Sequence, residues 1–424
     1  MIQANNPDLQ SWVNTPNNCD FPIQNLPFGV FSAANGQKKV GVAIGDYVLD
    51  LYEIASAGLL DTIEKDASIF NNDYLNPVIE KGKAYTRALR NKLSEILEAS
   101  NTVLKDNIEL RNKSLLPMDK VSMHLPVKVG DYTDFYSSID HATNVGKMFR
   151  DPANALLPNW LHIPVGYHGR ASSIITSGVA IKRPVGQVRP NPEEPPVLSA
   201  SRLLDFELEM AFVTYPGKPL GEKIAVDEAE DYIFGMCLFN DWSARDIQKW
   251  EYVPLGPFLG KSFASAISPW IVTLDALEPF RLSGPEQNPE VLDYLKYNGK
   301  KRFDINLEVY LQPQDKNPTL ISQSNFKHMY WNMSQQLAHH TINGCNILGG
   351  DMMGSGTISG PTPDSFGSML ELSWAGSKSI TLDDGSERKF IQDGDTVVMK
   401  GWSQNENVRI GFGEVSNKIL PADF

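Results

Sequence analysis

Cysteine is scarce in this chain of 424 residues, which has only three, at positions 19, 237 and 345. An odd number of cysteines at such wide spacing is not a disulfide framework, and it is typical of a protein from a reducing compartment. The sequence contains no Cys-x-x-Cys motif and no close Cys/His spacing, so a structural zinc site is not expected. We therefore expect a cytoplasmic protein.

Long apolar runs are also lacking, as is an excess of positive charge. No run approaches the ~18–20 apolar residues that a membrane-spanning helix needs. The first six residues, MIQANN, have neither the basic start nor the apolar core of a secretory signal. The chain has 38 Lys and Arg against 51 Asp and Glu, a formal net charge of −13. Binders of nucleic acid or of anionic membranes present a basic face, so neither partner is expected.

The composition does supply apolar material for a folded core. Hydrophobic residues make up 42% and aromatic residues 10% of the chain, which argues against disorder. The length suggests two or three domains. The acidic excess leaves one positive indication, because carboxylates that cluster in a fold would hold a hard cation.

The chain divides into a small first unit and a larger second one. Three strand-like segments near its start are separated by turn signals such as Gly45-Asp46. Apolar residues then recur every three or four positions between 85 and 97, which predicts a helix. This pattern ends at Pro117, so we place a domain boundary near residues 118–127. The rest of the chain is predicted to be β-rich.

An acidic strand-like segment, LLDFELEMAF at 203–212, is the most informative part of the sequence. Side chains alternate between the two faces of a strand, so Asp205, Glu207 and Glu209 are predicted to share one face. Carboxylates this close repel one another unless a cation or water relieves them. The pattern alone leaves two interpretations open: a solvated acidic face, or ligands of a divalent metal.

Two further segments carry chemically active side chains. One, at 130–141, contains Asp134 and His141, and the other, at 239–248, contains Asp241, Arg245 and Gln248. Taken singly, a histidine is more often structural than a base, and an aspartate or arginine often belongs to a turn or an ordinary ion pair. The combination of these segments favours a functional site.

These segments together resemble the fumarylacetoacetase family over nearly the whole chain. The matching stretches are DFPIQNLP at 20–27, GDYTDFYSS at 130–138, ALLPNW at 155–160, PVGYHGR at 164–170, NDWSARDIQ at 240–248, GPFLGKSF at 256–263, GTISG at 356–360 and SFGSMLELSW at 365–374. The resemblance implies a mainly β fold, with an N-terminal SH3-like barrel domain with a helical segment at 1–122 and a C-terminal mixed β-roll domain at 123–424. It also implies a homodimer.

The resemblance also implies a metal-dependent hydrolase that cleaves a carbon–carbon bond of fumarylacetoacetate, giving fumarate and acetoacetate in the last step of tyrosine and phenylalanine catabolism. By similarity, a catalytic Ca²⁺, or Mg²⁺, has four carboxylate ligands: Asp134, Glu207, Glu209 and Asp241. Asp205 is not a ligand in the family, and we interpret it as structural. A second cation, Mg²⁺, is expected near Lys261 and Ser265, where Ser265 replaces the threonine of the family.

The remaining roles also follow from the resemblance. His141 is expected to be the general base, with Glu371 orienting it. Arg245, Gln248 and Lys261 are expected to stabilise the oxyanion and the departing carbanion. Residues expected to bind the two carboxylate ends of the substrate are Tyr136, Arg150, Tyr167, Tyr252 and Thr357.

Two alternatives remain at this point. The chain could be another enzyme of the wider superfamily, such as an acylpyruvate hydrolase, although such chains are generally shorter and usually bind metal with three carboxylates. It could also be a non-catalytic cation-binding relative, which would have no need of His141, Glu371, Gln248 and Lys261.

Overall fold

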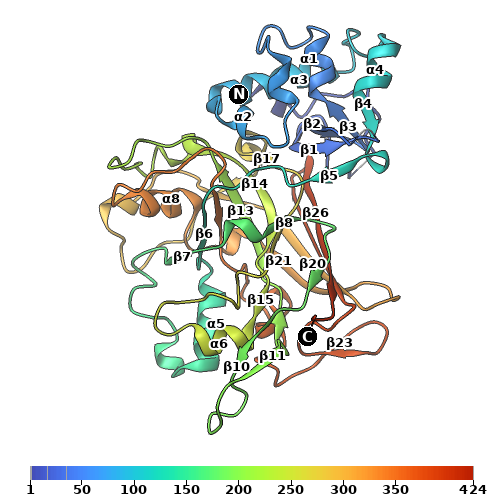
Figure 1. The fold of residues 1–424 in the computed structure, drawn as a ribbon. Helices are drawn as coiled ribbons and strands as arrows, with labels where there is room; N and C mark the ends of the chain where they lie inside the picture. Colours follow the sequence, from blue (N-terminus) through green and yellow to red (C-terminus); the bar gives the residue numbers. More distant parts are fainter. Residues whose placement is uncertain (1, 17, 35, 424) are drawn as a thin grey trace.

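An N-terminal unit forms one end of the molecule in the computed structural model, which describes residues 2–16, 18–34 and 36–423 (Figure 1). Its antiparallel sheet has the strand order β4-β3-β2-β1-β5. The strands are β1 (Phe28–Ser32), β2 (Lys38–Ile44), β3 (Tyr47–Asp50), β4 (Leu115–Pro117) and β5 (Ser122–His124). The helices are α1 (Leu51–Ser56), α2 (Asn76–Ile79), α3 (Gly82–Leu97) and α4 (Ile108–Ser114).

Two local predictions for this unit are confirmed. The turn at Gly45-Asp46 joins β2 to β3, with Ile44 paired to Tyr47. Helix α3 covers the predicted periodic segment and buries its leucines. The predicted boundary between residues 122 and 123 falls inside β5, which pairs with β1. That boundary and the SH3-like barrel stay predictions.

The larger unit is built on two sheets and is mainly β, as predicted. The first sheet is mixed and has the order β7-β6-β22-β13-β14-β16-β8, with β17 paired to β14. Its strands are β6 (Tyr132–Phe135), β7 (Gly166–His168), β8 (Ile174–Thr176), β13 (Leu208–Thr214), β14 (Ile233–Asn240), β16 (Ser265–Ile267), β17 (Val272–Thr273) and β22 (Met352–Gly354). We call it the central sheet.

The second sheet has the order β21-β20-β25-β26-β9. Its strands are β9 (Ile181–Lys182), β20 (Asn306–Gln312), β21 (Thr319–Asn325), β25 (Thr396–Gln404) and β26 (Arg409–Leu420). Short two-stranded ribbons are β10 (Val185–Val188) with β11 (Val197–Ala200), β12 (Leu204–Asp205) with β15 (Ser243–Ala244), β18 (Arg281–Leu282) with β19 (Arg302–Phe303), and β23 (Ile380–Thr381) with β24 (Glu387–Arg388). The helices are α5 (Ile139–Phe149), α6 (Arg245–Glu251), α7 (Leu274–Leu277), α8 (Met333–Thr341) and α9 (Met369–Leu372).

The central sheet is covered on both faces. Along β13, Leu208, Met210 and Phe212 belong to the core shared with the second sheet. Ala211 and Val213 point the other way, into a core shared with the N-terminal unit. Because neither face of β13 meets water, an acidic side chain on this strand must find its partners inside the protein.

The strand predicted from the segment at 203–212 differs from the structure in one respect. It is interrupted after Asp205, which ends β12, and β13 begins at Leu208. Glu207 lies between them and forms an isolated bridge with Ser368. The acidic side chains therefore do not line one continuous strand, and the interruption sends Asp205 toward different partners from Glu209. None of the described helices is long and apolar enough to cross a membrane.

Candidate active site

Four buried carboxylates meet where strands of the central sheet end. Asp134 lies in β6 and Glu209 in β13, while Glu207 comes just before β13 and Asp241 just after β14. Each offers an oxygen atom, and these oxygen atoms all lie within 4.8 Å of one another. All four side chains are buried, and Glu209 is 0% exposed. A solvated acidic face is therefore ruled out, and we call this set the carboxylate cluster.

The strand register explains why the cluster forms here. Leu208 pairs with Asn240 across β13 and β14, which sets Glu207 beside Asp241. On the other side, Gly354 of β22 pairs with both Ala211 of β13 and Asp134 of β6. A methyl group on Gly354 would lie 2.8 Å from Asp134 Oδ1 and 3.0 Å from Glu209 Oε2. Glycine at this position is what lets the two carboxylates approach.

Two cations neutralise one side of the cluster. Lys261 Nζ contacts Glu207 and lies 2.6 Å from Asp241 Oδ2. Arg245 Nη1 lies 2.7 Å from Glu207 Oε1. Burial opposes ionisation of Glu207, but Lys261 and Arg245 outweigh it and lower the pKa of this carboxyl to about 2. Glu207 is thus held ionised by its neighbours.

On the other side of the cluster the compensation is weaker. Lys261 acts on Asp134 and Glu209 without contacting them. In the described chain, Glu209 Oε2 accepts only the backbone N–H of Gly356 (2.9 Å). Asp134 Oδ1 and Glu209 Oε1 are buried and have no hydrogen-bond partner among the described residues. Burial, followed by repulsion from neighbouring carboxylates such as Asp241, raises the pKa of both groups well above the ordinary values. Oxygen atoms of this kind, gathered without protein donors, fit the ligand set of a hard divalent cation.

A histidine and a glutamate form a second buried pair close to the cluster. His141 Nδ1 lies 2.6 Å from Glu371 Oε2, and both side chains are almost wholly buried. Burial would raise the pKa of Glu371, but the interaction with His141 and hydrogen bonds from Asn144 and Ser359 outweigh burial and lower this pKa. An ionised carboxylate only accepts hydrogen bonds, so Nδ1 is the donor and Nε2 is left as the accepting nitrogen.

The pair is held in place at the N-terminal ends of the two helices that supply it, α5 and α9. Ser138 caps α5 by accepting from the backbone N–H of His141 (3.2 Å). Ser368 caps α9 and accepts from the backbone N–H of Glu371 (3.3 Å). Three side-chain donors also bind the Glu371 carboxylate: Ser359 (2.8 Å), Ser368 (3.0 Å) and Asn144 (2.9 Å). The orientation of the glutamate is therefore fixed before any ligand arrives.

Most of the other predicted site residues surround these two groups. Tyr136 sets its ring edge-on to His141, with centroids 5.2 Å apart. Tyr167 donates to Asp241 Oδ2 (3.1 Å), and Ser265 donates to Asp241 Oδ1 (2.8 Å). Gln248 Oε1 lies 3.5 Å from Arg245 Nη1.

The remaining predicted residues differ in burial. Thr357 is buried, in the stretch that follows β22. Arg150 and Tyr252 are exposed, and the guanidinium of Arg150 donates to the carbonyl of Ala155 (2.7 Å). The structure therefore does not bring these two side chains into the buried group.

Sequence reasoning missed several residues that shape the site. Gly354 gave no usable signal, because its close approach depends on pairing between strands that are distant in the chain. The donors to Glu371 were also missed, although a serine three residues before Glu371 is a recognisable helix-capping pattern. These donors are Asn144, Ser359 and Ser368.

The fold and the site define a β-rich protein with a buried oxygen-ligand cluster beside a histidine–carboxylate pair. Comparison with known proteins identifies the family within this class. Residues 24–126 match the family model "Fumarylacetoacetase N-terminal", and residues 132–420 match "Fumarylacetoacetate (FAA) hydrolase C-terminal". The chain belongs to the fumarylacetoacetase family.

Individual relatives agree with this assignment. The chain is 54% identical to the fumarylacetoacetase of Bos taurus over 414 residues, covering 97% of this chain and 99% of the relative. It is 51% identical to the Arabidopsis thaliana protein of the same name, over 98% and 99% of the two chains. A solved fumarylacetoacetate hydrolase from Exiguobacterium antarcticum shares the fold, with a TM-score of 0.53, 17% identity, and coverage of 93% and 99%.

The crowding at Gly354 gives a testable prediction for the cluster. Gly354→Ala should weaken the binding of a divalent cation, with calcium as the probe, about 10-fold or more, the effect typical of displacing groups that position metal ligands. Titration calorimetry of chelator-stripped protein measures this. Gly29→Ala is the control, because a methyl group there meets the Trp270 ring at 2.7 Å, far from the cluster in the N-terminal sheet. Equal calcium affinity in the folded Gly354→Ala variant would contradict the prediction.

Proposed function

We propose that the chain hydrolyses the carbon–carbon bond of fumarylacetoacetate, giving fumarate and acetoacetate in the last step of tyrosine and phenylalanine catabolism. The observation that carries the proposal is the buried carboxylate cluster beside the His141–Glu371 pair. It occurs in a chain about half identical to fumarylacetoacetases over its full length. The enzyme is thus a hydrolase acting on a carbon–carbon bond of a ketone.

Asp134, Glu207, Glu209 and Asp241 would hold a divalent cation, Ca²⁺ or Mg²⁺. The unpartnered Asp134 and Glu209 oxygen atoms support this proposal, since a buried anion without a donor is costly. When bound, such an ion supplies a Lewis acid that polarises the carbonyl under attack and orients the diketone. Four carboxylates with one divalent ion leave two formal negative charges, which Lys261 and Arg245 offset.

His141 acts as the general base. Its Nδ1 proton is committed to Glu371, so Nε2 takes a proton from water. The carboxylate of Glu371 holds the ring in this tautomer and stabilises the imidazolium that forms. The effect of His141 on the pKa of Glu207 supports this role, because it requires the imidazole to lie near the cluster.

Arg245, Lys261 and Gln248 supply the donors for the negative charge that develops during the reaction. Arg245 Nη2 is buried without a partner among the residues described here, so a guanidinium N–H is available. Lys261 is held by Glu207 and Asp241, and coulombic attraction to Asp241 and Glu207 overcomes the effect of burial and raises the pKa of this amine. Both cations therefore stay charged. A carbon leaving group departs poorly, so this stabilisation is a large part of the catalysis.

Tyr136, Arg150, Tyr167, Tyr252 and Thr357 bind the two carboxylate ends of the substrate in this proposal. The position of Tyr136 against the ring of His141 supports its role, as does the contact of Tyr167 with Asp241. Arg150 and Tyr252 lie at the exposed ends of α5 and α6, where they meet a ligand that enters from solvent. Arg150 supplies positive charge for a dianion approaching a protein of net charge −13.

A second cation, Mg²⁺, is proposed near Lys261 and Ser265. In the part of the chain that the structure describes, the carboxylate cluster is the one group of three or more metal-ligating side chains. The Ser265 hydroxyl is bound to Asp241, and backbone oxygen and water would have to complete this site.

We further propose that the protein is a cytoplasmic homodimer. Its three cysteines are free thiols, as in a reducing compartment. A run of large apolar side chains after α6 supports self-association, with Leu255 96% exposed and Val253 and Phe258 each 67% exposed. Sedimentation equilibrium should give twice the mass of one chain at micromolar concentration, and the mass of a single chain would contradict the dimer.

The general base is tested by His141→Phe. This variant should fold and bind calcium but lose about 10²–10⁴-fold in kcat, the range typical of general-base catalysis. The measurement is the disappearance of fumarylacetoacetate in a spectrophotometric assay, with circular dichroism and calorimetry as controls for folding and metal binding. Near-normal turnover would remove His141 from its assigned role. The same assay with acylpyruvates separates this enzyme from an acylpyruvate hydrolase.

Metal removal tests the cluster. Exhaustive dialysis against a chelator should abolish hydrolysis, and Ca²⁺ or Mg²⁺ should restore it, because the carboxylate oxygens repel one another without an ion. The rate before and after adding back each ion is the measurement. Full activity in metal-free protein would contradict the proposal. Bound metal without hydrolysis of any diketone would identify a non-catalytic relative instead.

A further inference from the structure

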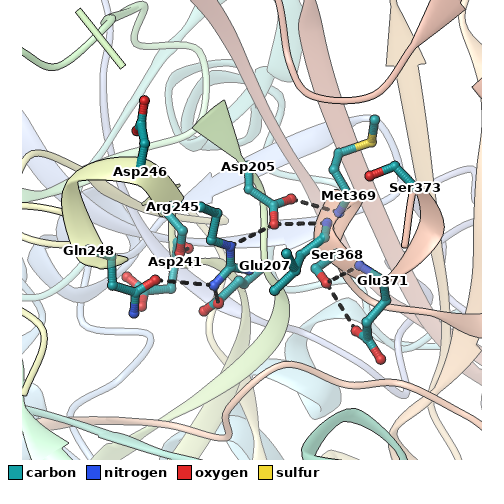
Figure 2. Close-up of polar contacts among 12 residues, drawn as sticks. Asp205, Glu207, Asp241, Arg245, Asp246, Gln248, Ser368, Met369, Glu371 and Ser373 are labelled. Carbon is teal, nitrogen blue, oxygen red and sulfur yellow. Dashed lines mark hydrogen bonds and ion pairs between the residues drawn. The ribbon is translucent and has the colours of Figure 1, made fainter. Parts of the chain in front are cut away.

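Asp205 contacts two parts of the site, Arg245 and the start of α9 (Figure 2), and these contacts suggest a role beyond structure alone. It lies at the end of β12 and is 0% exposed. We propose that Asp205 is a positioning residue for the reaction, holding Arg245 toward the carboxylate cluster and α9 toward His141. This inference rests on the proposed function, because it assigns Asp205 to the same site.

The first connection is to Arg245. Asp205 Oδ2 accepts a hydrogen bond from Arg245 Nε at 2.8 Å, while Arg245 Nη1 binds Glu207 (2.7 Å). The guanidinium is planar and presents its donors in a fixed fork. Fixing Nε and Nη1 therefore also fixes the direction of Nη2, the buried N–H without a described partner. Asp205 thus orients Arg245 Nη2, the donor that we assign to the negative charge developing during the reaction.

The second connection is to α9. Asp205 Oδ1 accepts from the backbone N–H of Met369 (2.6 Å), and Oδ2 accepts from the backbone N–H of Leu370 (3.0 Å). These are the first two residues of α9, whose N–H groups have no partner inside the helix. The next residue is Glu371, which orients His141. Anchoring this first turn holds the Glu371 carboxylate at its distance from the imidazole.

The same contacts exclude a direct role. Both oxygens of Asp205 are occupied by protein donors, and Asp205 is not among the residues of the carboxylate cluster. Figure 2 shows its carboxylate between Arg245 on one side and the start of α9 on the other. Asp205 therefore acts through Arg245 and Glu371 rather than on the metal or the substrate.

The test uses Asp205→Asn, an isosteric change that removes the charge and one accepting oxygen. We expect kcat to fall about 10–100-fold, the cost typical of losing a group that orients a site residue, with KM changed less than about 3-fold. In an Arg245→Gln background the same change should lower kcat by a smaller factor, because the guanidinium is already gone and only the anchoring of α9 is left to lose. A wild-type kcat, or equal losses in both backgrounds, would overturn the proposal.

Asp246→Asn is the matched control. Asp246 follows Arg245 in the chain and also accepts a backbone N–H, that of Arg202 (2.7 Å), together with the Ser201 hydroxyl (2.6 Å). Figure 2 shows that it points away from the site. The kcat of Asp246→Asn should stay within about 2-fold of wild type, because Asp246 holds the segment at Ser201 and Arg202 and orients no residue of the site.

A second pair of variants tests the link to α9 if Asp205→Asn does not fold. Met369→Pro removes the backbone N–H that donates a hydrogen bond to Asp205 Oδ1. Proline is tolerated at this position because it is the first residue of the helix. Met369→Ala removes a similar amount of side chain but keeps the N–H. We expect kcat of the proline variant to lie at least 10-fold below that of the alanine variant, the loss typical of a broken positioning contact. Equal values would overturn the anchoring role.

Hydrogen exchange separates this inference from the proposed function. Deuterium uptake by the peptide over residues 368–373 should rise in Asp205→Asn and stay unchanged in Asp246→Asn, whatever the substrate. If wild-type protein does not hydrolyse fumarylacetoacetate, the proposed function fails while the exchange result still decides whether Asp205 holds α9. Unchanged uptake in Asp205→Asn would overturn that part of the inference.

Discussion

The burial of four carboxylates in one small volume is the constraint on which the rest of the site depends. Asp134, Glu207, Glu209 and Asp241 place oxygen atoms within 4.8 Å of one another, out of contact with water. Like charges at this distance in a protein interior repel strongly. Lys261 and Arg245 relieve the repulsion at Glu207 and Asp241, but the free oxygens of Asp134 and Glu209 have no donor in the described chain. These free oxygen atoms could hold a metal ion.

The scaffold maintains this unfavourable arrangement because it is stabilised elsewhere. Apolar side chains cover both faces of the central sheet, one against the second sheet and the other against the N-terminal unit. The strands are thus held in register by packing that does not involve the acids. This separates the stability of the fold from the chemistry of the site, and it lets Gly354 serve only as space between Asp134 and Glu209.

The cluster and the His141–Glu371 pair come from distant segments, and a network of buried hydrogen bonds joins them. Glu371 is bound by four side chains, and its short helix α9 is anchored to Asp205, which also binds Arg245. Buried hydrogen-bond networks of this kind are rigid, because each member restricts the next. Glu207, Arg245 and Glu371 are therefore oriented together rather than separately (Figure 2).

The sequence by itself determined the local features of this protein: the Gly45-Asp46 turn, the amphipathic helix α3 and the mainly β character of the chain. Its motifs indicated the fumarylacetoacetase family and named the four cluster carboxylates, because residue types that serve one reaction recur together. Only the tertiary structure decided that Glu209 is buried rather than solvated and that Gly354 must lack a side chain. It also decided that Asp205 lies on a separate strand from Glu209 and has different partners. The positions of Glu209 and Gly354 depend on pairing between strands more than a hundred residues apart in the chain, and no local pattern records which strands will meet.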